Sequence, residues 1–177
     1  MSSLVIYFSR SGENYFGGEL KNIEKGNTEV IAEYIKELDG ADLFKVETVI
    51  DYPEDYMECI DVAKKEQQVA GRPKLKQSLD NIDEYDKIYI GFPNWWGTLP
   101  MAMFTQLEQL DFTGKTVKPF VTHEGSGFGS SLKDFDNLNL PILIAPNIFY
   151  YIMNFLKFYL YLSTIYQSKI SKSICPG

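Results

Sequence analysis

The sequence is poor in the residues that build metal centres, disulfide frameworks and nucleic-acid sites. Its 177 residues include two cysteines, Cys59 and Cys175, and one histidine, too few for a disulfide framework or a four-ligand zinc site. The formal charge of −7 and the pI near 4.8 exclude nucleic acid as an expected partner, because phosphate backbones are held mainly by clustered Lys and Arg. The N-terminus has no basic segment followed by a leader-like apolar run, which favours a reducing, cytoplasmic setting.

The chain does have enough apolar material for one core. Hydrophobic residues make up 45% of the chain and aromatic residues 15%. A length of 177 residues argues against two full domains. Charge is uneven, because no acidic residue follows Asp136 and the tail carries only three lysines, so the front part has a net charge of −10. We therefore predict a folded domain over residues 1–135 and treat residues 136–177 as an atypical, apolar C-terminal segment.

Strand and helix patterns alternate along the front part. The apolar run Ser3–Ser9 predicts a buried central strand, and apolar residues at helical spacing over 30–38 predict a helix that Asn27 or Thr28 caps and Gly40 ends. Further strands are predicted over 41–48, 86–92 and 115–122, with helices over 57–70 and after Pro100. This order implies an α/β fold in three layers, doubly wound around a parallel sheet. Ligands bind such sheets at the carboxyl ends of their strands, where three polar loops of this chain converge.

The first loop, SRSGEN at residues 9–14, and the GNT triplet at 26–28 resemble an anion nest at a helix N-terminus. An ordinary strand-to-helix turn with a cap explains the same residues equally well. The chain has neither a dinucleotide fingerprint nor a Walker lysine, so any nucleotide bound here is expected to be a mononucleotide.

The second loop, GFPNWWGTLP at residues 91–100, holds both tryptophans of the chain beside Gly and Pro. Paired indoles on a rigid loop can stack on a planar ring such as a flavin, although either one can instead pack as core. The third loop, THEGSGFGSS at 122–131, brings glycines, Ser126 and His123, the only histidine. His123 is a candidate proton relay, with a structural histidine as the alternative, and Cys59 is expected to pack as a small apolar residue.

The chain resembles the flavodoxin family, specifically its flavodoxin-like oxidoreductase branch, in four segments: LVIYFSRSGEN, KGNTEVIAEYI, YDKIYIGFPNWWGTLPMAMFTQLEQLDFTGK and PFVTHEGSGFGSS. The resemblance implies a five-stranded parallel sheet of order 2-1-3-4-5, with flavin mononucleotide (FMN) at the switch between strands one and three. It implies phosphate contacts from Ser9, Ser11, Asn27 and Thr28, with help from Arg10 and Asn14, although the chain spreads this loop over an extra YFGGELKNIEK segment. It implies ring contacts from Pro93, Asn94, Trp95, Trp96 and Gly97, with Trp96 stacking, and from His123, Glu124, Gly125, Ser126 and Gly127 at the other edge.

The function implied by the resemblance is electron transfer through bound FMN, from a nicotinamide cofactor to a quinone-like acceptor, with a simple electron carrier also open. His123 is the candidate catalytic residue, and no metal is expected. The alternative is a cofactor-free remnant of the fold that acts as an interaction module. In the tail, 140–145 can form strand five and 147–166 a helix that is apolar nearly all round. A frameshift, a dimer interface or, less in keeping with Asn154 and Lys157, a membrane anchor would explain that composition.

Overall fold

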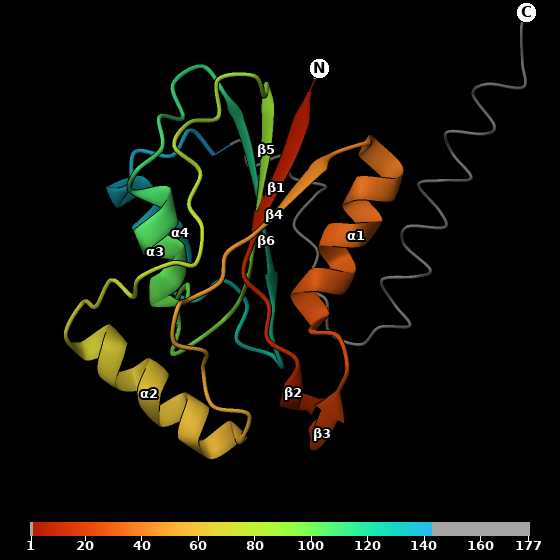
Figure 1. Cartoon of the computed structure of the whole chain (residues 1–177), viewed down its shortest axis with the longest axis vertical. Coiled ribbons are helices and arrows are strands. Elements are labelled where there is room, and N and C mark those ends of the chain that lie inside the picture. The colour runs from red at the N-terminus through yellow and green to blue at the C-terminus, as the bar shows by residue number, and fades with distance from the viewer. Residues whose placement is uncertain (1, 143–177) are drawn as a thin grey trace, which may run out of the picture.

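The computed structural model describes residues 2–142 and contains a parallel sheet with helices on both faces (Figure 1). The strands lie in the order β4-β1-β5-β6 and all three pairs are parallel. They are β1 (Ser3–Tyr7), β4 (Asp42–Lys45), β5 (Lys87–Pro93) and β6 (Thr116–Thr122). Numbered as the sequence predicted them, this is the expected order 2-1-3-4.

Where the fifth strand was expected, Ile142 forms a parallel bridge with Val117 of β6. The rest of that strand and the apolar segment after it lie outside the described residues. The predictions of a late helix, a dimer interface or a membrane anchor in the tail fall there, and the division of the chain at residue 135 remains a prediction. Within residues 2–142, no helix is both long and apolar enough to cross a bilayer.

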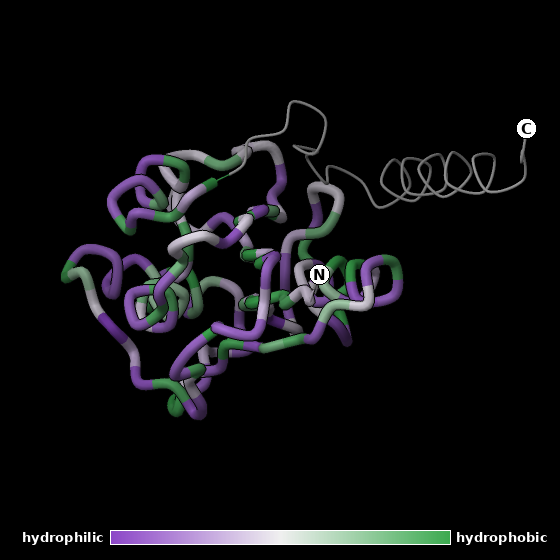
Figure 2. The backbone as a smooth tube through the Cα atoms, turned by 90° about the horizontal axis from the view of Figure 1, so that it is seen from above, coloured by the Kyte–Doolittle hydropathy of each residue, from purple (hydrophilic) through white to green (hydrophobic). Residues whose placement is uncertain are grey.

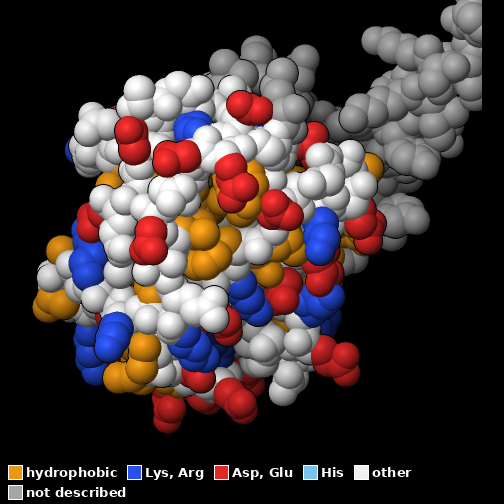
Figure 3. All heavy atoms as spheres, turned by 45° about the horizontal axis from the view of Figure 1, so that its top comes forward, with side chains coloured by type: hydrophobic (Ala, Val, Ile, Leu, Met, Phe, Trp, Pro, Cys, Tyr) orange, Lys and Arg blue, Asp and Glu red, His pale blue; other side chains and the backbone are white. Residues whose placement is uncertain are grey.

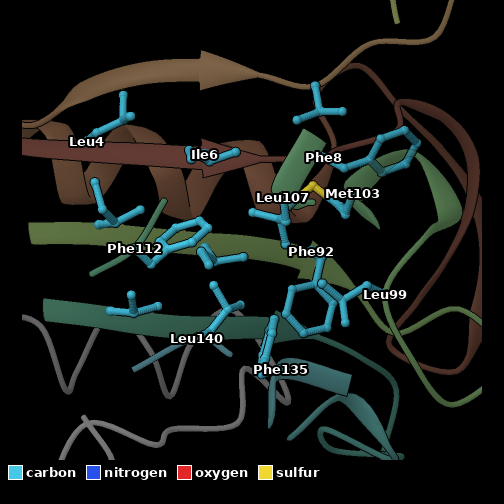
Figure 4. Close-up of a cluster of buried hydrophobic side chains, with 14 of the residues drawn as sticks. Leu4, Ile6, Phe8, Phe92, Leu99, Met103, Leu107, Phe112, Phe135 and Leu140 are labelled. Atoms are coloured by element: carbon cyan, nitrogen blue, oxygen red, sulfur yellow. The ribbon is translucent and has the colours of Figure 1, made fainter. Parts of the chain in front are cut away.

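The two faces of the sheet are built from alternate residues of its strands, since successive side chains point to opposite sides. Leu4, Ile6 and Phe8 join the larger core, under α3 (Met101–Leu107) and α4 (Ser131–Asn137), with Met103, Leu107 and Phe135 (Figure 4). Val5 and Tyr7 face α1 (Asn27–Asp39) on the other side. The view from above shows α1 and the other helices on opposite sides of the strands (Figure 2). The core fixes the strand ends on which the polar loops stand.

Helix α1 begins earlier than either predicted N-cap residue, Asn27 or Thr28, would allow. Its N-cap is Gly26, so Asn27 and Thr28 are the first two helical residues rather than the cap. Gly40 ends it as predicted, in a left-handed conformation with φ +66° and its N–H bonded to the Lys36 carbonyl at 2.9 Å.

A β-hairpin was not predicted and fills the extra segment between β1 and α1. Its strands, β2 (Gly12–Phe16) and β3 (Glu19–Ile23), are antiparallel, and the turn residues Gly17 and Gly18 have φ of +68° and +85°. Two positive φ angles in a two-residue turn are what glycine pairs supply. The hairpin lies beyond the carboxyl ends of the sheet strands (Figure 1).

Helix α2 (Tyr56–Gln68) lies near the same end of the sheet, farther from the strands than α3 (Figure 1). Asp55 caps it by accepting the Glu58 N–H at 2.8 Å. On the face drawn in Figure 3, acidic side chains are interspersed with lysines and arginines.

Candidate functional site

The loops after β1, β5 and β6 meet at one edge of the sheet and surround a cavity of about 300 Å³, the main cavity. Eight of the predicted site residues line it: Asn14, Asn27, Pro93, Asn94, Trp95, His123, Glu124 and Ser126. It also has walls that the sequence did not point to: Tyr15, Phe16, Gly17, Ile31, Tyr56 and Thr122. One end of the main cavity therefore meets the start of α1 and the other meets the loops that follow β5 and β6.

The start of α1 is packed tightly against the loop after β1. The Ser9 hydroxyl accepts the Glu29 N–H at 3.1 Å, which leaves its own hydrogen for an anion. A β-carbon at Gly26 would overlap the Ser9 hydroxyl and the Arg10 carbonyl, so only glycine fits there. The unpaired N–H groups and the dipole of a helix start attract phosphate, which suits the position of Asn27 on the cavity wall.

Four of the predicted phosphate ligands, Ser9, Arg10, Ser11 and Thr28, are not among the residues that line the main cavity. Ser9 and Arg10 line the same hollow as Ser11. Thr28 is buried, and its hydroxyl lies 2.8 Å from that of Thr122, which ties the start of α1 to the end of β6. Ser11 is exposed and lines a larger open hollow of about 480 Å³ on the side of β4. That hollow is also lined by four carboxylates, Glu24, Glu47, Asp51 and Glu54, and by only two cations, Arg10 and Lys45, so its net charge would repel a phosphate. Of the two cavities, the main cavity is the better anion site.

Arg10 does not line the main cavity, and its side chain instead holds neighbouring backbone segments together. Its guanidinium donates to the Pro53 carbonyl at 3.0 and 2.6 Å, and also to the carbonyls of Glu54 and Glu13. Arginine's planar fork suits such a set of fixed acceptors. The side chain thus joins the base of the hairpin to the segment before α2, and a contact with phosphate stays a prediction.

The two tryptophans occupy opposite sides of a tight turn. Trp95 and Thr98 exchange backbone hydrogen bonds of 2.9 and 3.1 Å, and Trp96 and Gly97 between them have φ of +52° and +86°. Trp95 lines the main cavity and packs edge-on against Phe8 and Tyr52, with ring centroids 5.1 and 4.9 Å apart.

Trp96 does not line the main cavity but lines an adjoining cavity, and its stacking on a bound ring stays a prediction. Its indole nitrogen donates to the Ile60 carbonyl of α2 at 2.9 Å, and 46% of the residue's surface is exposed. Trp96 has a left-handed backbone, and its indole lies against α2. Of the two tryptophans, Trp95 lines the main cavity.

Asn94 holds the second and third loops together. Its amide nitrogen donates to the Gly127 carbonyl at 2.6 Å, and its amide oxygen accepts the Gly97 N–H at 2.9 Å. Its own backbone N–H donates to the Thr122 carbonyl at 2.9 Å. Asn94 therefore sets the spacing of two walls of the main cavity, besides lining it.

His123 projects from the end of β6 and is half-buried. Its Nδ1 accepts the Gly125 N–H at 2.8 Å, so the neutral ring carries its hydrogen on Nε2. Burial lowers the pKa of His123, and the nearby Glu124 carboxylate only partly offsets this effect. The imidazole is accordingly neutral at pH 7.

The hairpin covers the side of the main cavity that faces away from the sheet, and we call it the roof of the cavity. Glu124 accepts the N–H groups of Gly17 and Gly18 at 3.2 and 2.9 Å, which anchors the hairpin tip to the loop after β6. Tyr15 packs edge-on against Tyr56 of α2 with centroids 5.0 Å apart. The Gly-Gly dipeptide between two runs of strand-forming length was the signal that could have predicted this roof.

The arrangement fits an elongated ligand that carries an anionic group at one end and a flat ring at the other. Among residues 2–142, no group of three or more His, Cys, Asp and Glu side chains is placed to hold a metal ion. Cys59 is a buried free thiol, as expected of a packing residue, and burial raises its pKa.

Comparison with known proteins adds a family and three similar structures. The flavodoxin family model matches residues 3–150. Structures of candidate flavoproteins from Bacteroides eggerthii and Bacteroides uniformis are each 28% identical, with TM-scores of 0.65 and 0.66, and cover 80% of this chain and 84% and 86% of their own. A flavoprotein from Lactobacillus acidophilus in complex with FMN is 26% identical, with a TM-score of 0.61, and covers 80% of this chain and 89% of its own. None of the curated proteins compared with the chain matches it.

Proposed function

Because the chain belongs to the flavodoxin family, we propose that it binds FMN in the main cavity and transfers electrons through it. The observation that carries the proposal is the reach of this cavity, from Asn27 at the start of α1 to Trp95 and His123 at the loops after β5 and β6. A ligand with a phosphate and a flat ring system joined by a short chain would occupy both ends of this cavity at once. The similar protein that was crystallised with FMN supports the choice of flavin.

At the phosphate end, binding would rest on the first turn of α1 and on neutral donors. The Ser9 hydroxyl, held by the Glu29 N–H, and the Asn27 side chain stand beside the helix start. The negative charge of Glu29, in that same first turn, is paired with the Lys45 ammonium at 2.6 Å. A phosphate would then meet N–H groups and hydroxyls with less repulsion than the sequence alone suggests.

At the ring end, Trp95 offers an aromatic surface that is fixed by Phe8 and Tyr52. The peptide groups of Pro93 and Asn94, and those of the loop from His123 to Gly127, would meet the edges of the ring. Asn94 keeps these two loops at a fixed distance through Gly127 and Gly97. The hairpin and Tyr56 would exclude water from the main cavity, and the lower local dielectric strengthens electrostatic interactions there.

Bound FMN would supply reversible uptake of one or two electrons, with a potential tuned by the surrounding hydrogen bonds and charges. In the complete reaction, a nicotinamide cofactor loses a hydride, which is two electrons and one proton. A quinone gains two electrons and two protons to become a hydroquinone, so one further proton comes from water. His123 is the proposed proton relay for that step. Its neutral ring carries its only N–H hydrogen on Nε2, so the relay would take up a proton from water on Nδ1, in place of the bond from the Gly125 N–H, as it gives up the proton on Nε2.

The test is the visible absorption spectrum of the purified full-length chain, with and without added FMN, followed by dithionite. We expect retained flavin bands that bleach on reduction. A folded protein that ignores FMN would contradict the proposal and favour the non-catalytic remnant.

Anaerobic mixing of the FMN-loaded protein with reduced nicotinamide cofactors, and then with quinones, separates an enzyme from a carrier. Direct bleaching by the nicotinamide and recovery by the quinone are expected of the enzyme. Reduction only through a separate reductase would identify a carrier.

A homodimer and a cytoplasmic location stay predictions, and the buried free thiol of Cys59 suits a reducing compartment.

A further inference from the structure

A second cavity, of about 230 Å³, adjoins the main cavity. The two share four wall residues: Asn14, Tyr56, Asn94 and Trp95. The second cavity lies between α2 and the tryptophan loop, and it lacks any contribution from α1 and from the loop after β6. It is therefore a side chamber that joins the main cavity at the aromatic end, away from the proposed phosphate site.

One wall of this chamber is a single face of α2. Tyr56, Cys59, Ile60 and Ala63 follow one another at intervals of three, one and three residues, which places them on the same side of a helix. Cys59 and Ala63 are buried although they border a cavity. The apolar face of α2 thus looks across the chamber toward the indoles.

The opposite wall includes Trp96, whose backbone conformation is strained. Trp96 has a φ of +52°, a conformation that bulky L-residues rarely adopt. Its indole nitrogen bonds the Ile60 carbonyl, its own carbonyl accepts from Gln67 at 3.0 Å, and the Lys64 ammonium lies 4.6 Å from its ring centre. Three contacts with α2 compensate for the unfavourable backbone angle and keep the two walls at a fixed separation.

We propose that this chamber is the acceptor pocket, which binds an uncharged, single-ring quinone beside the ring of bound FMN. This inference rests on the proposed function and names the site of its second substrate. Aromatic walls on one side and apolar side chains on the other select a flat, neutral molecule. Arg10, the only charged group in the pocket walls, already donates to three backbone carbonyls and offers little to a carboxylate or phosphate.

Size and chemistry narrow the occupant further. The pocket is smaller than the main cavity, which suits one ring and excludes a whole nicotinamide dinucleotide. Trp95 and Asn94 belong to both cavities, so an occupant of the pocket would lie next to the electron source. The Cys59 thiol also borders the pocket, and its raised pKa keeps it protonated, which protects a quinone from attack by a thiolate.

The test fills the pocket from α2 with Ala63→Leu in the FMN-loaded protein. The matched control is Gln68→Leu, which adds the same side chain at an exposed position of the same helix. Binding of hydroquinone to the oxidised protein, under anaerobic conditions, is followed by tryptophan fluorescence and by long-wavelength charge-transfer absorbance. Both tryptophans of the chain line the pocket, and Trp95 also lines the main cavity, so the reference is the fluorescence of the FMN-loaded protein without hydroquinone.

We expect Ala63→Leu to weaken hydroquinone binding and raise the KM for tetramethyl-1,4-benzoquinone, each about tenfold or more. The affinity for FMN and the reduction of ferricyanide, which needs no pocket, should stay within about twofold of the wild type in both variants. Ile60→Ala provides the opposite change, because it enlarges the pocket without altering the backbone carbonyl that Trp96 uses. It should raise kcat/KM for a two-ring naphthoquinone relative to the one-ring quinone.

The outcomes separate this inference from the proposed function. A wild-type protein that fails to bind FMN overturns both. A wild-type protein that binds FMN and reduces no quinone overturns the acceptor pocket and leaves the carrier form of the proposed function. A wild-type protein that reduces quinones, with hydroquinone binding unchanged in Ala63→Leu and no change of ring preference in Ile60→Ala, overturns the acceptor pocket alone.

Discussion

The floor and the roof of the main cavity are built in different ways. The floor consists of the loop after β1 with the start of α1, and of the loops after β5 and β6. It stands on strands whose residues Ile6, Ile90 and Val121 are at most 3% exposed. The roof consists of the β2–β3 hairpin, and much of its surface is exposed. The floor is therefore held by buried apolar area, at about 25 cal/mol per Å², whereas the roof depends on a few polar contacts.

This difference predicts where the molecule opens. Segments with few buried apolar contacts open locally at a small fraction of the global free energy of unfolding. The roof is attached by Glu124 at the hairpin tip, by Arg10 at its base and by the Tyr15–Tyr56 contact at its side. Changes in the floor should therefore affect ligand affinity together with stability, and changes in the roof should affect the rate of ligand exchange.

The largest effect is expected from Gly26→Ala in the floor. The added methyl group would overlap the Ser9 hydroxyl and the Arg10 carbonyl, so the loop after β1 must separate from the start of α1. Overpacking of this kind costs about 1–3 kcal/mol of stability. FMN affinity should fall about 100-fold, or ~2.7 kcal/mol, because the proposed phosphate site is the part displaced. Fluorescence titration with FMN and urea unfolding measure the two effects.

Gly114→Ala is the matched control for this change. Gly114 has a φ of +74° and open space around it, so alanine there costs about 1–2 kcal/mol of backbone strain and meets no neighbour. It should lower stability by a similar amount and leave FMN affinity unchanged. Equal losses of FMN affinity in the two variants would show that instability, and not the phosphate site, causes the loss.

A smaller effect is expected from Glu124→Gln, which weakens the attachment of the roof. The carboxylate accepts two N–H groups of the hairpin turn, and a neutral amide offers a single oxygen and weaker bonds. FMN release should become about fivefold faster, which corresponds to ~1 kcal/mol, with little change in urea stability. Stopped-flow fluorescence after dilution measures the release rate.

Glu19→Gln controls for the loss of one negative charge from the hairpin region. Glu19 is an exposed residue of β3, and its carboxylate pairs with Lys21 at 3.2 Å and does not contact the loop after β6. It should release FMN at the wild-type rate. If Glu124→Gln also releases FMN at that rate, the contact between the hairpin and the third loop does not close the cavity.

The same contrast explains which parts of the structure could be predicted from the sequence. The floor followed from apolar runs such as Ser3–Tyr7, from Gly40 after the first helix and from polar loops at strand ends, because burial leaves a regular pattern. The roles of Thr28 and Arg10 did not follow, since their partners, Thr122 and Pro53, lie 94 and 43 residues away. The roof was missed because β2 is mostly half-buried and β3 mostly exposed, so neither strand alternates buried and exposed side chains and the Gly-Gly turn was the only signal.

The two indoles show the limit of predicting a side chain's direction. Trp95 and Trp96 are adjacent and identical in type, yet one lines the main cavity and the other contacts α2. The choice depends on the left-handed φ of Trp96, and the Asn-Trp-Trp-Gly sequence does not specify it, because a turn there can adopt several geometries.

The smallest effect, and the one that bears on chemistry, concerns the protonation of His123 where floor and roof meet. Because it is the only histidine, an NMR titration of its ring protons gives its pKa without assignment, and we expect a value below the ordinary 6.5. The unfolded chain then binds a proton before the folded one as the pH falls. This contribution to stability is complete above pH 6.5 and is lost as the pH drops through the lowered pKa. His123→Gln should flatten the slope of urea stability in that window. A folded pKa at or above 6.5 would mean that Glu124 outweighs burial.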